Sequence, residues 1–155
     1  KIQNTVNQLL LTNMLKDYPL DALMNELDMI NAIAPDIAEV YYCQAVVLGQ
    51  IQKRDEEAIG KFNRALQYGY ADTTSLYYNM AVSYRHLKDY DSAIKYLMMA
   101  DECTPDNPQV LHAISVTYSD MGNEEKAVEY DVKLRNLQFA NKVNVPYLLG
   151  NDEEG

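Results

Sequence analysis

Apolar residues between positions 74 and 107 recur at helical spacing on two successive stripes. The first stripe consists of Tyr77, Met80, Ala81 and Tyr84, and the second of Ala93, Leu97 and Ala100. Positions separated by three, four and seven residues share one face of an α-helix, so each stripe predicts one amphipathic helix. The polar residues 88–91 separate the stripes, and Pro105 follows the second, where it cannot continue a helix interior. The segment is therefore predicted to form a helix–turn–helix unit.

The same unit recurs on both sides at a period of about 34 residues, which is typical of stacked helical hairpins. Its stripe residues are Tyr41, Gln44, Ala45, Leu48, Ala58, Phe62 and Ala65 in residues 39–72, and Leu111, Ile114, Ser115, Tyr118 and Ala127 in residues 108–137. The earlier unit carries one extra residue, which we expect in the turn at residues 52–55. In the later unit, Asp131 and Leu134 replace an aromatic and a small residue. Such departures are expected where no further repeat follows.

Residues 4–35 contain a more divergent unit. Its apolar positions are Val6, Leu9, Leu10 and Met14 before a break at residues 17–19, and Leu23, Leu27 and Ile30 after it. Pro35 stands in the closing position, and Pro19 suits the first turn of the second helix, where its missing N–H is not needed. We interpret this segment as a divergent repeat or cap.

The final segment, residues 138–155, breaks the pattern. Asn141, Asn144, Pro146 and Gly150 argue against one long helix, so a C-terminal tail is predicted here. Two interpretations of this tail remain open. It is either a frayed chain end, or its apolar residues 147–149 fold back over the last helix or dock into a neighbouring molecule.

The unit at residues 74–107 resembles the tetratricopeptide repeat (TPR) family, whose pattern is aromatic-x2-Leu-Gly-x2-Tyr, then Ala-x3-aromatic-x2-Ala, then Pro. Here the pattern reads Tyr77-x2-Met80-Ala81-x2-Tyr84, Ala93-x3-Leu97-x2-Ala100 and Pro105. Including the divergent unit, the resemblance covers roughly residues 4–137. It implies an all-α fold in which residues 1–137 form a right-handed superhelical array of antiparallel helix pairs. It also implies that the first helix of each repeat lines a concave surface where ligands lie.

The composition of the chain argues against several classes of function. The chain has 155 residues and is 48% hydrophobic, which is enough for one folded unit with a sizeable core. Its formal net charge of −10 repels phosphate backbones and anionic headgroups, so nucleic acid is not expected as a partner. No apolar run approaches the length of a membrane span, so no membrane insertion is expected. Cys43 and Cys103 lack disulfide or zinc spacing and are expected to be buried or half-buried thiols.

The candidate binding residues are those beside the packing stripes on the predicted first helices. They are Tyr42, Val46, Gly49 and Gln50, then Tyr78, Asn79, Val82, Arg85 and His86, then His112, Val116, Ser119 and Asp120. This mixture suits an extended peptide or a partner helix, with tyrosine and arginine as the strongest anchors. We therefore expect a non-enzymatic scaffold that binds a protein or peptide. Alternatively, Tyr42 and Tyr78 only pack against the adjacent repeat.

One subtype of the family can be tested against these positions. The resemblance implies that co-chaperones of this family hold acidic chaperone tails through a clamp of Lys, Asn and Arg. Asn79 matches one clamp position, but the remaining positions read Tyr42, Val46, Gln109 and Ala113 and carry no charge. A carboxylate pair needs several cationic donors, so an uncharged or mildly basic ligand is the better expectation.

An enzyme remains a weaker alternative, in which His86, His112 and Asp120 approach one another across the groove as an acid–base pair or metal site. The sequence contains no catalytic motif of the metalloprotease, phosphate-loop or serine-hydrolase type, so no enzyme activity, cofactor or metal is predicted.

Self-assembly is a third hypothesis. The apolar residues Leu9, Leu10, Leu11 and Met14 would allow two molecules to stack end to end as a homo-oligomer. The repeats also fit the regulatory part of a larger protein. The sequence leaves the compartment open: cytoplasmic by default, and secreted or periplasmic if a signal peptide precedes Lys1.

Overall fold

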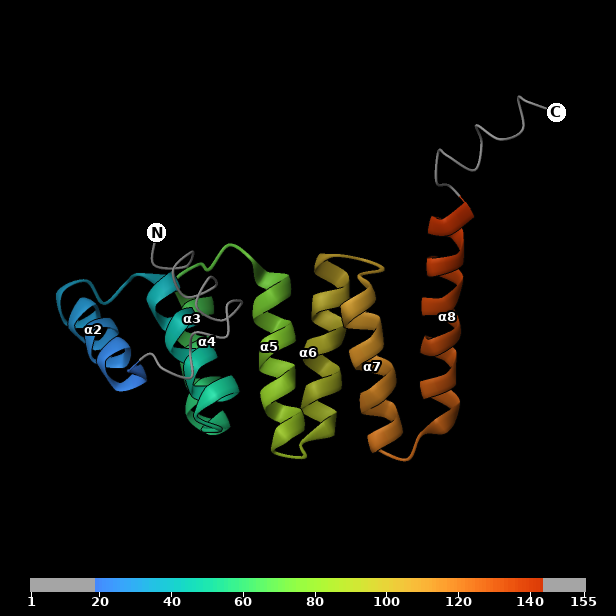
Figure 1. Ribbon diagram of the computed structural model, residues 1–155, viewed down its shortest axis with the longest axis horizontal. Coiled ribbons are helices and arrows are strands. Elements are labelled where there is room, and N and C mark those ends of the chain that lie inside the picture. Colours follow the sequence, from blue (N-terminus) through green and yellow to red (C-terminus); the bar gives the residue numbers. More distant parts are fainter. Residues whose placement is uncertain (1–18, 144–155) are drawn as a thin grey trace, which may run out of the picture.

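The computed structural model describes residues 19–143 of the chain. Its α-helices are α2 (Leu20–Ile33), α3 (Ala38–Val46), α4 (Asp55–Gln67), α5 (Thr73–His86), α6 (Tyr90–Cys103), α7 (Pro108–Asp120) and α8 (Glu124–Val143), and a π-helical turn, η2 (Val47–Ile51), directly follows α3. The helices stand side by side in one row (Figure 1), and no strand occurs in the described range. The predicted all-α array of helix pairs is therefore confirmed.

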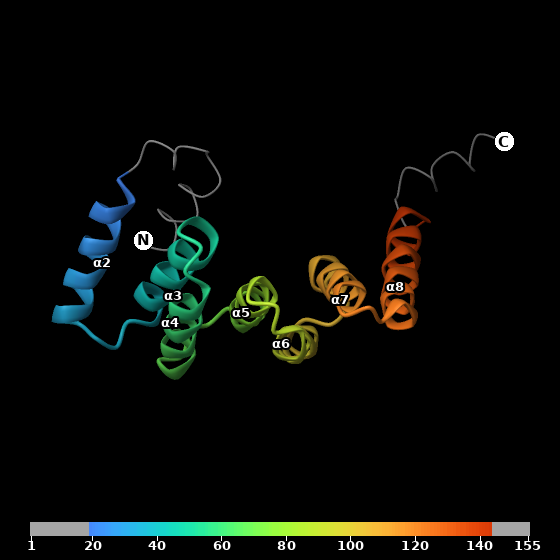
Figure 2. The same cartoon turned by 90° about the horizontal axis from the view of Figure 1, so that it is seen from below.

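The helices in the middle of the row are staggered. Seen from below, α5, α6 and α7 are viewed along their axes, and α6 lies in a different layer from its two neighbours (Figure 2). The main contacts run between helices that follow one another in the chain, as expected for a repeat array in which each unit packs on the next. No helix in the described part of the chain is both long and apolar enough to cross a membrane.

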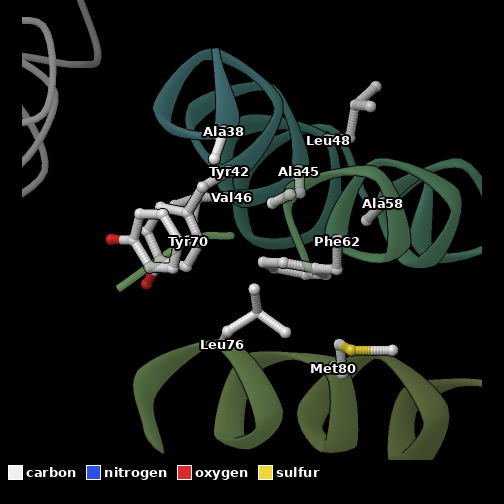
Figure 3. Close-up of a cluster of buried hydrophobic side chains, with 11 residues drawn as sticks. Ala38, Tyr42, Ala45, Val46, Leu48, Ala58, Phe62, Tyr70, Leu76 and Met80 are labelled. Atoms are coloured by element: carbon white, nitrogen blue, oxygen red, sulfur yellow. The ribbon is translucent and has the colours of Figure 1, made fainter. Parts of the chain in front are cut away.

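The core follows the predicted stripes. Tyr42 of α3, Phe62 of α4, and Leu76 and Met80 of α5 meet in one buried cluster together with Tyr70 (Figure 3). The small stripe residues Ala81, Ala93 and Ala100 are almost completely buried in a second cluster. Small side chains at these crossings allow the helix backbones to approach closely.

The extra residue of the unit at 39–72 lies in the helix, and its predicted place in the turn at 52–55 is wrong. The backbone N–H groups of Asp89 and Asn123, the residues before α6 and α8, donate to carbonyls five residues back, at Tyr84 and Tyr118. The equivalent N–H of Arg54 donates to the carbonyl of Leu48, six residues back. The residue preceding each of these three donors has a positive φ, so the turns themselves are alike. The helix absorbs the insertion by widening one turn into η2.

The helix at the end of the array is longer than predicted. α8 continues past Gln138 to Val143, so the break expected at Gln138 was placed too early. Asn141 lies inside this helix, because an exposed Asn costs little in a last helical turn. The predicted first helix through Val6 to Met14, including the proposed stacking residues, and the tail interpretations for residues 147–149 lie outside the described residues.

Candidate functional site

Two hollows lie along the layer that contains the first helices. The larger, of about 380 Å³, lies between η2, α5 and the start of α7 and is lined by Gln50, Thr74, Ser75, Tyr78, Asn79, Val82, Asn107, Gln109 and Val110. The smaller, of about 130 Å³, lies further along α5 and α7 and is lined by Tyr78, Ala81, Val82, Arg85, Leu97, His112, Ala113, Val116 and Thr117. Tyr78 and Val82 border both hollows, so α5 forms a common wall. We call the two hollows together the first-helix groove.

Most of the predicted binding residues border this groove. Gln50, Tyr78, Asn79 and Val82 line the larger hollow, and Arg85, His112 and Val116 line the smaller one. Val46 and His86 line a narrow third space next to Gly49, which holds about 10 Å³. The structure thus brings these side chains together, and their role in binding remains a prediction.

Tyr42 does not line the groove. Its side chain is buried, with its ring stacked on Tyr70 at a centroid distance of 4.2 Å and its edge toward Phe62 at 5.8 Å (Figure 3). The expectation that Tyr42 is exposed for binding is therefore wrong. Its ring stacks within its own repeat, and its hydroxyl contacts Asn79 of the adjacent one. The helical period alone could not show this, because the ring of Tyr70, from the loop after α4, covers Tyr42.

Tyr42 instead supports a polar chain that ends in the groove. The side-chain N–H of Asn79 donates to the Tyr42 hydroxyl at 2.9 Å, and Gln50 donates to the Asn79 carbonyl oxygen at 3.2 Å. Burial raises the pKa of Tyr42, so its hydroxyl stays protonated and neutral. These contacts hold the carboxamide of Asn79 in one orientation at the wall of the larger hollow.

The larger hollow is polar but uncharged. Its lining includes four carboxamides, from Gln50, Asn79, Asn107 and Gln109, and no ionisable group except the Tyr78 phenol. A carboxamide offers both donors and an acceptor, which matches the N–H and C=O groups of a peptide backbone. The hollow therefore suits an uncharged segment of a ligand.

An arginine–aspartate ion pair and a histidine–aspartate contact flank the uncharged region. Arg85 of α5 donates to Asp120 of α7 at 2.7 Å, and His86 Nδ1 lies 3.1 Å from Asp55 Oδ1, a carboxylate that is 8% exposed. The acid–base group imagined from His86, His112 and Asp120 is thus not assembled, because His86 and Asp120 each contact a different partner. Within the described residues, no group of three or more His, Cys, Asp or Glu side chains is placed to hold a metal ion.

Sequence reasoning missed the residues at the beginnings of α5 and α7. Thr74, Ser75, Gln109 and Val110 belong to the first turns of these helices, and Asn107 caps α7 by accepting from the N–H groups of Gln109 and Val110 at 3.0 and 3.3 Å. The capping residues Asp72 and Asn107 were the available signal, since they mark where first turns begin.

Comparison with known proteins finds a family match for two segments of the chain. Residues 74–107 and 108–130 match the tetratricopeptide repeat, which confirms the predicted resemblance over these two units. No curated protein matches the chain. The repeat match supports a protein-interaction scaffold in general terms.

Solved structures share the fold at low sequence identity. One is MamA 41-end from Desulfovibrio magneticus RS-1, with a TM-score of 0.76 and 16% identity, covering 90% of this chain and 75% of that chain. Another, named MamA MSR-1 C2, has a TM-score of 0.71 and 23% identity over 83% of this chain and 72% of that chain. PilW, a widely conserved type IV pilus biogenesis factor, has a TM-score of 0.71 and 19% identity, covering 79% of this chain and 56% of that chain. These likenesses show the fold alone.

Proposed function

We propose that this chain, which carries tetratricopeptide repeats at residues 74–107 and 108–130, is a non-enzymatic scaffold that binds an extended peptide or a segment of a partner protein in the first-helix groove. The observation that carries the proposal is the pair of adjoining hollows along α5, with Asn79 held in a fixed orientation beside the partly exposed side chains of Tyr78 and Val82. A site that is oriented before binding loses less conformational entropy when the ligand arrives.

The ligand segment in the larger hollow is uncharged. A buried charge needs a charged partner, and the lining carboxamides provide none. Arg85, which lines the neighbouring hollow, pairs with Asp120. The net charge of −10 also opposes the approach of a strongly acidic peptide.

The non-enzymatic part of the proposal rests on the same contacts. Arg85 pairs with Asp120, and His86 contacts Asp55. His112 also lines the smaller hollow, where the hydroxyl of Thr117 donates to the carbonyl of Ala113. A general base needs a free lone pair that faces a reacting atom, and a nucleophile needs such a base next to it. The carboxamides and the tyrosine phenol provide neither.

A peptide-display selection against the full chain tests the function. Peptides that bind are re-measured by titration calorimetry with two variants that add the same single charge: Val82→Asp, between the two hollows, and Asn63→Asp, on the exposed side of α4. We expect Val82→Asp to weaken binding by at least about tenfold, because it places an unpaired charge where the ligand excludes water. Asn63→Asp should leave affinity unchanged. Equal affinities for both folded variants would show that the groove is not the site.

A further inference from the structure

The outer face of α8 exposes large apolar side chains. Val128, Val132 and Phe139 are 57%, 47% and 70% exposed, and their spacing of four and seven residues puts them on one face of the helix. We call these three residues the α8 stripe. The other face of α8, with Ala127 and Tyr130, packs against α7 and the preceding core cluster.

The period of the array explains why this face is apolar. Ile94 and Met98 of α6 precede Val128 and Val132 by one repeat. Both are partly buried and pack against the same core cluster as Tyr118 and Tyr130 of the following helices. The Tyr130 hydroxyl lies 3.6 Å from the sulfur of Met98. Val128 and Val132 of the α8 stripe thus occupy positions that, one repeat earlier, pack against the next element of the array.

We propose that residues 145–149 of this chain, Val-Pro-Tyr-Leu-Leu, pack on the α8 stripe and cover it as the next element of the array would. These residues begin two positions after Val143, the last described residue of α8. Apart from Pro146, all of them are apolar or aromatic. Proline soon after a helix end favours a change of chain direction.

The chain is long enough for this contact. Phe139 lies about 6 Å, and Val132 about 16 Å, back along the helix axis from residue 143. An extended segment from residue 144 to residue 149 spans up to about 20 Å. After a reversal that uses two residues, residues 147–149 therefore pass Phe139 and approach Val132.

Charge favours the same arrangement. From Lys133 to the end of α8, the helix carries Lys133, Arg135 and Lys142 and no carboxylate, whereas residues 144–155 carry Asp152, Glu153 and Glu154 and no basic side chain. Lys133 already pairs with Asp106 at 3.2 Å. Arg135 lies on the exposed face between Val132 and Phe139, and no ion pair within residues 19–143 engages it. A tail that lies on the stripe brings its acidic end toward this arginine.

Amide hydrogen exchange on the full chain tests the proposal. The tail variant Tyr147→Ser, Leu148→Ser removes apolar contact without adding charge, and Asn151→Ala is the matched control in the same segment. We expect the tail variant to accelerate exchange at residues 136–143 by about fivefold or more, because the covering segment no longer holds the last turns of α8 closed. Exchange in α5 should not change.

The stripe variant Phe139→Ser completes a double-mutant cycle with the tail variant. It should accelerate the same amides, and combining it with the tail variant should add little, since both remove one contact. Unchanged exchange in the tail variant would overturn the proposal. Protection that is lost on about hundredfold dilution of the unmodified chain would overturn it too, because a second copy would then cover the stripe.

Discussion

The helix pairs α3–η2–α4 and α5–α6 have the same arrangement, but their helices begin differently. In α5–α6, Asp72 and Asp89 each cap a helix by accepting from a backbone N–H, that of Ser75 at 3.1 Å and that of Ser92 at 3.2 Å. In α3–α4, the corresponding residues Ile37 and Arg54 make no side-chain cap. The α5–α6 pair is therefore stabilised in part by side-chain caps at the start of each helix, and the α3–α4 pair lacks these caps.

The first pair depends on tertiary contacts instead. Tyr42, Phe62 and Tyr70 form an aromatic group in its core, and the buried Gln44 contacts α2 on the other side, donating to Asp28 at 2.7 Å and accepting from Asn31 at 2.9 Å. These contacts hold a first helix that contains an irregular turn. The comparison shows that an array can accept an insertion where packing, not local capping, sets the helix position.

The largest expected effect is the loss of this packing. Phe62→Ala should lower the free energy of unfolding by about 3–5 kcal/mol, because the ring is almost fully buried and leaves a cavity between α3, α4 and α5. Urea unfolding followed by circular dichroism measures the change. A loss similar to that of an exposed substitution such as Gln67→Ala would contradict the dependence on tertiary contacts.

A pair of glycines tests the irregular turn. A Cβ at Gly49 in η2 would lie 3.0 Å from Ser83 Oγ and 3.3 Å from Ala58 Cβ, whereas one at Gly60 in α4 meets nothing within 4 Å. Gly49→Ala should therefore destabilise by about 1–2 kcal/mol. Gly60→Ala should stabilise by about 0.5–1 kcal/mol through helix propensity. Melting temperatures of the two variants should shift in opposite directions. An increase for both would show that the packing around η2 accommodates a methyl group at position 49.

The smallest effect concerns the caps. Asp89→Ala should lower the free energy of unfolding by about 1 kcal/mol, because the first turn of α6 loses its acceptor. At the equivalent position before α4, Arg54→Ala removes an exposed pair with Glu57 and a long, exposed hydrogen bond to Gln52, and should cost less than about 0.5 kcal/mol. Chemical denaturation of both variants gives the difference. Equal losses would mean that the two pairs are held in the same way.

Sequence periodicity predicted the helix pairs because burial of one stripe per helix is a local pattern. It also placed Tyr78, Asn79, Val82 and Arg85 beside the groove, since these positions follow directly from the stripe of α5. It failed for Tyr42, whose exposure depends on Tyr70 from the loop after α4. It also failed for the partner of His86, because Asp55 belongs to another repeat.

The sequence by itself therefore determined the class of fold, the period of the array and the side of each helix that packs, because these follow from the spacing of apolar residues along one helix. Only the tertiary structure decided that the extra residue widens α3 into η2, that Gln50 and Tyr42 together hold Asn79, and that α8 exposes an apolar stripe. Each of these depends on which side chains from distant parts of the chain meet, and a local pattern carries no information about that.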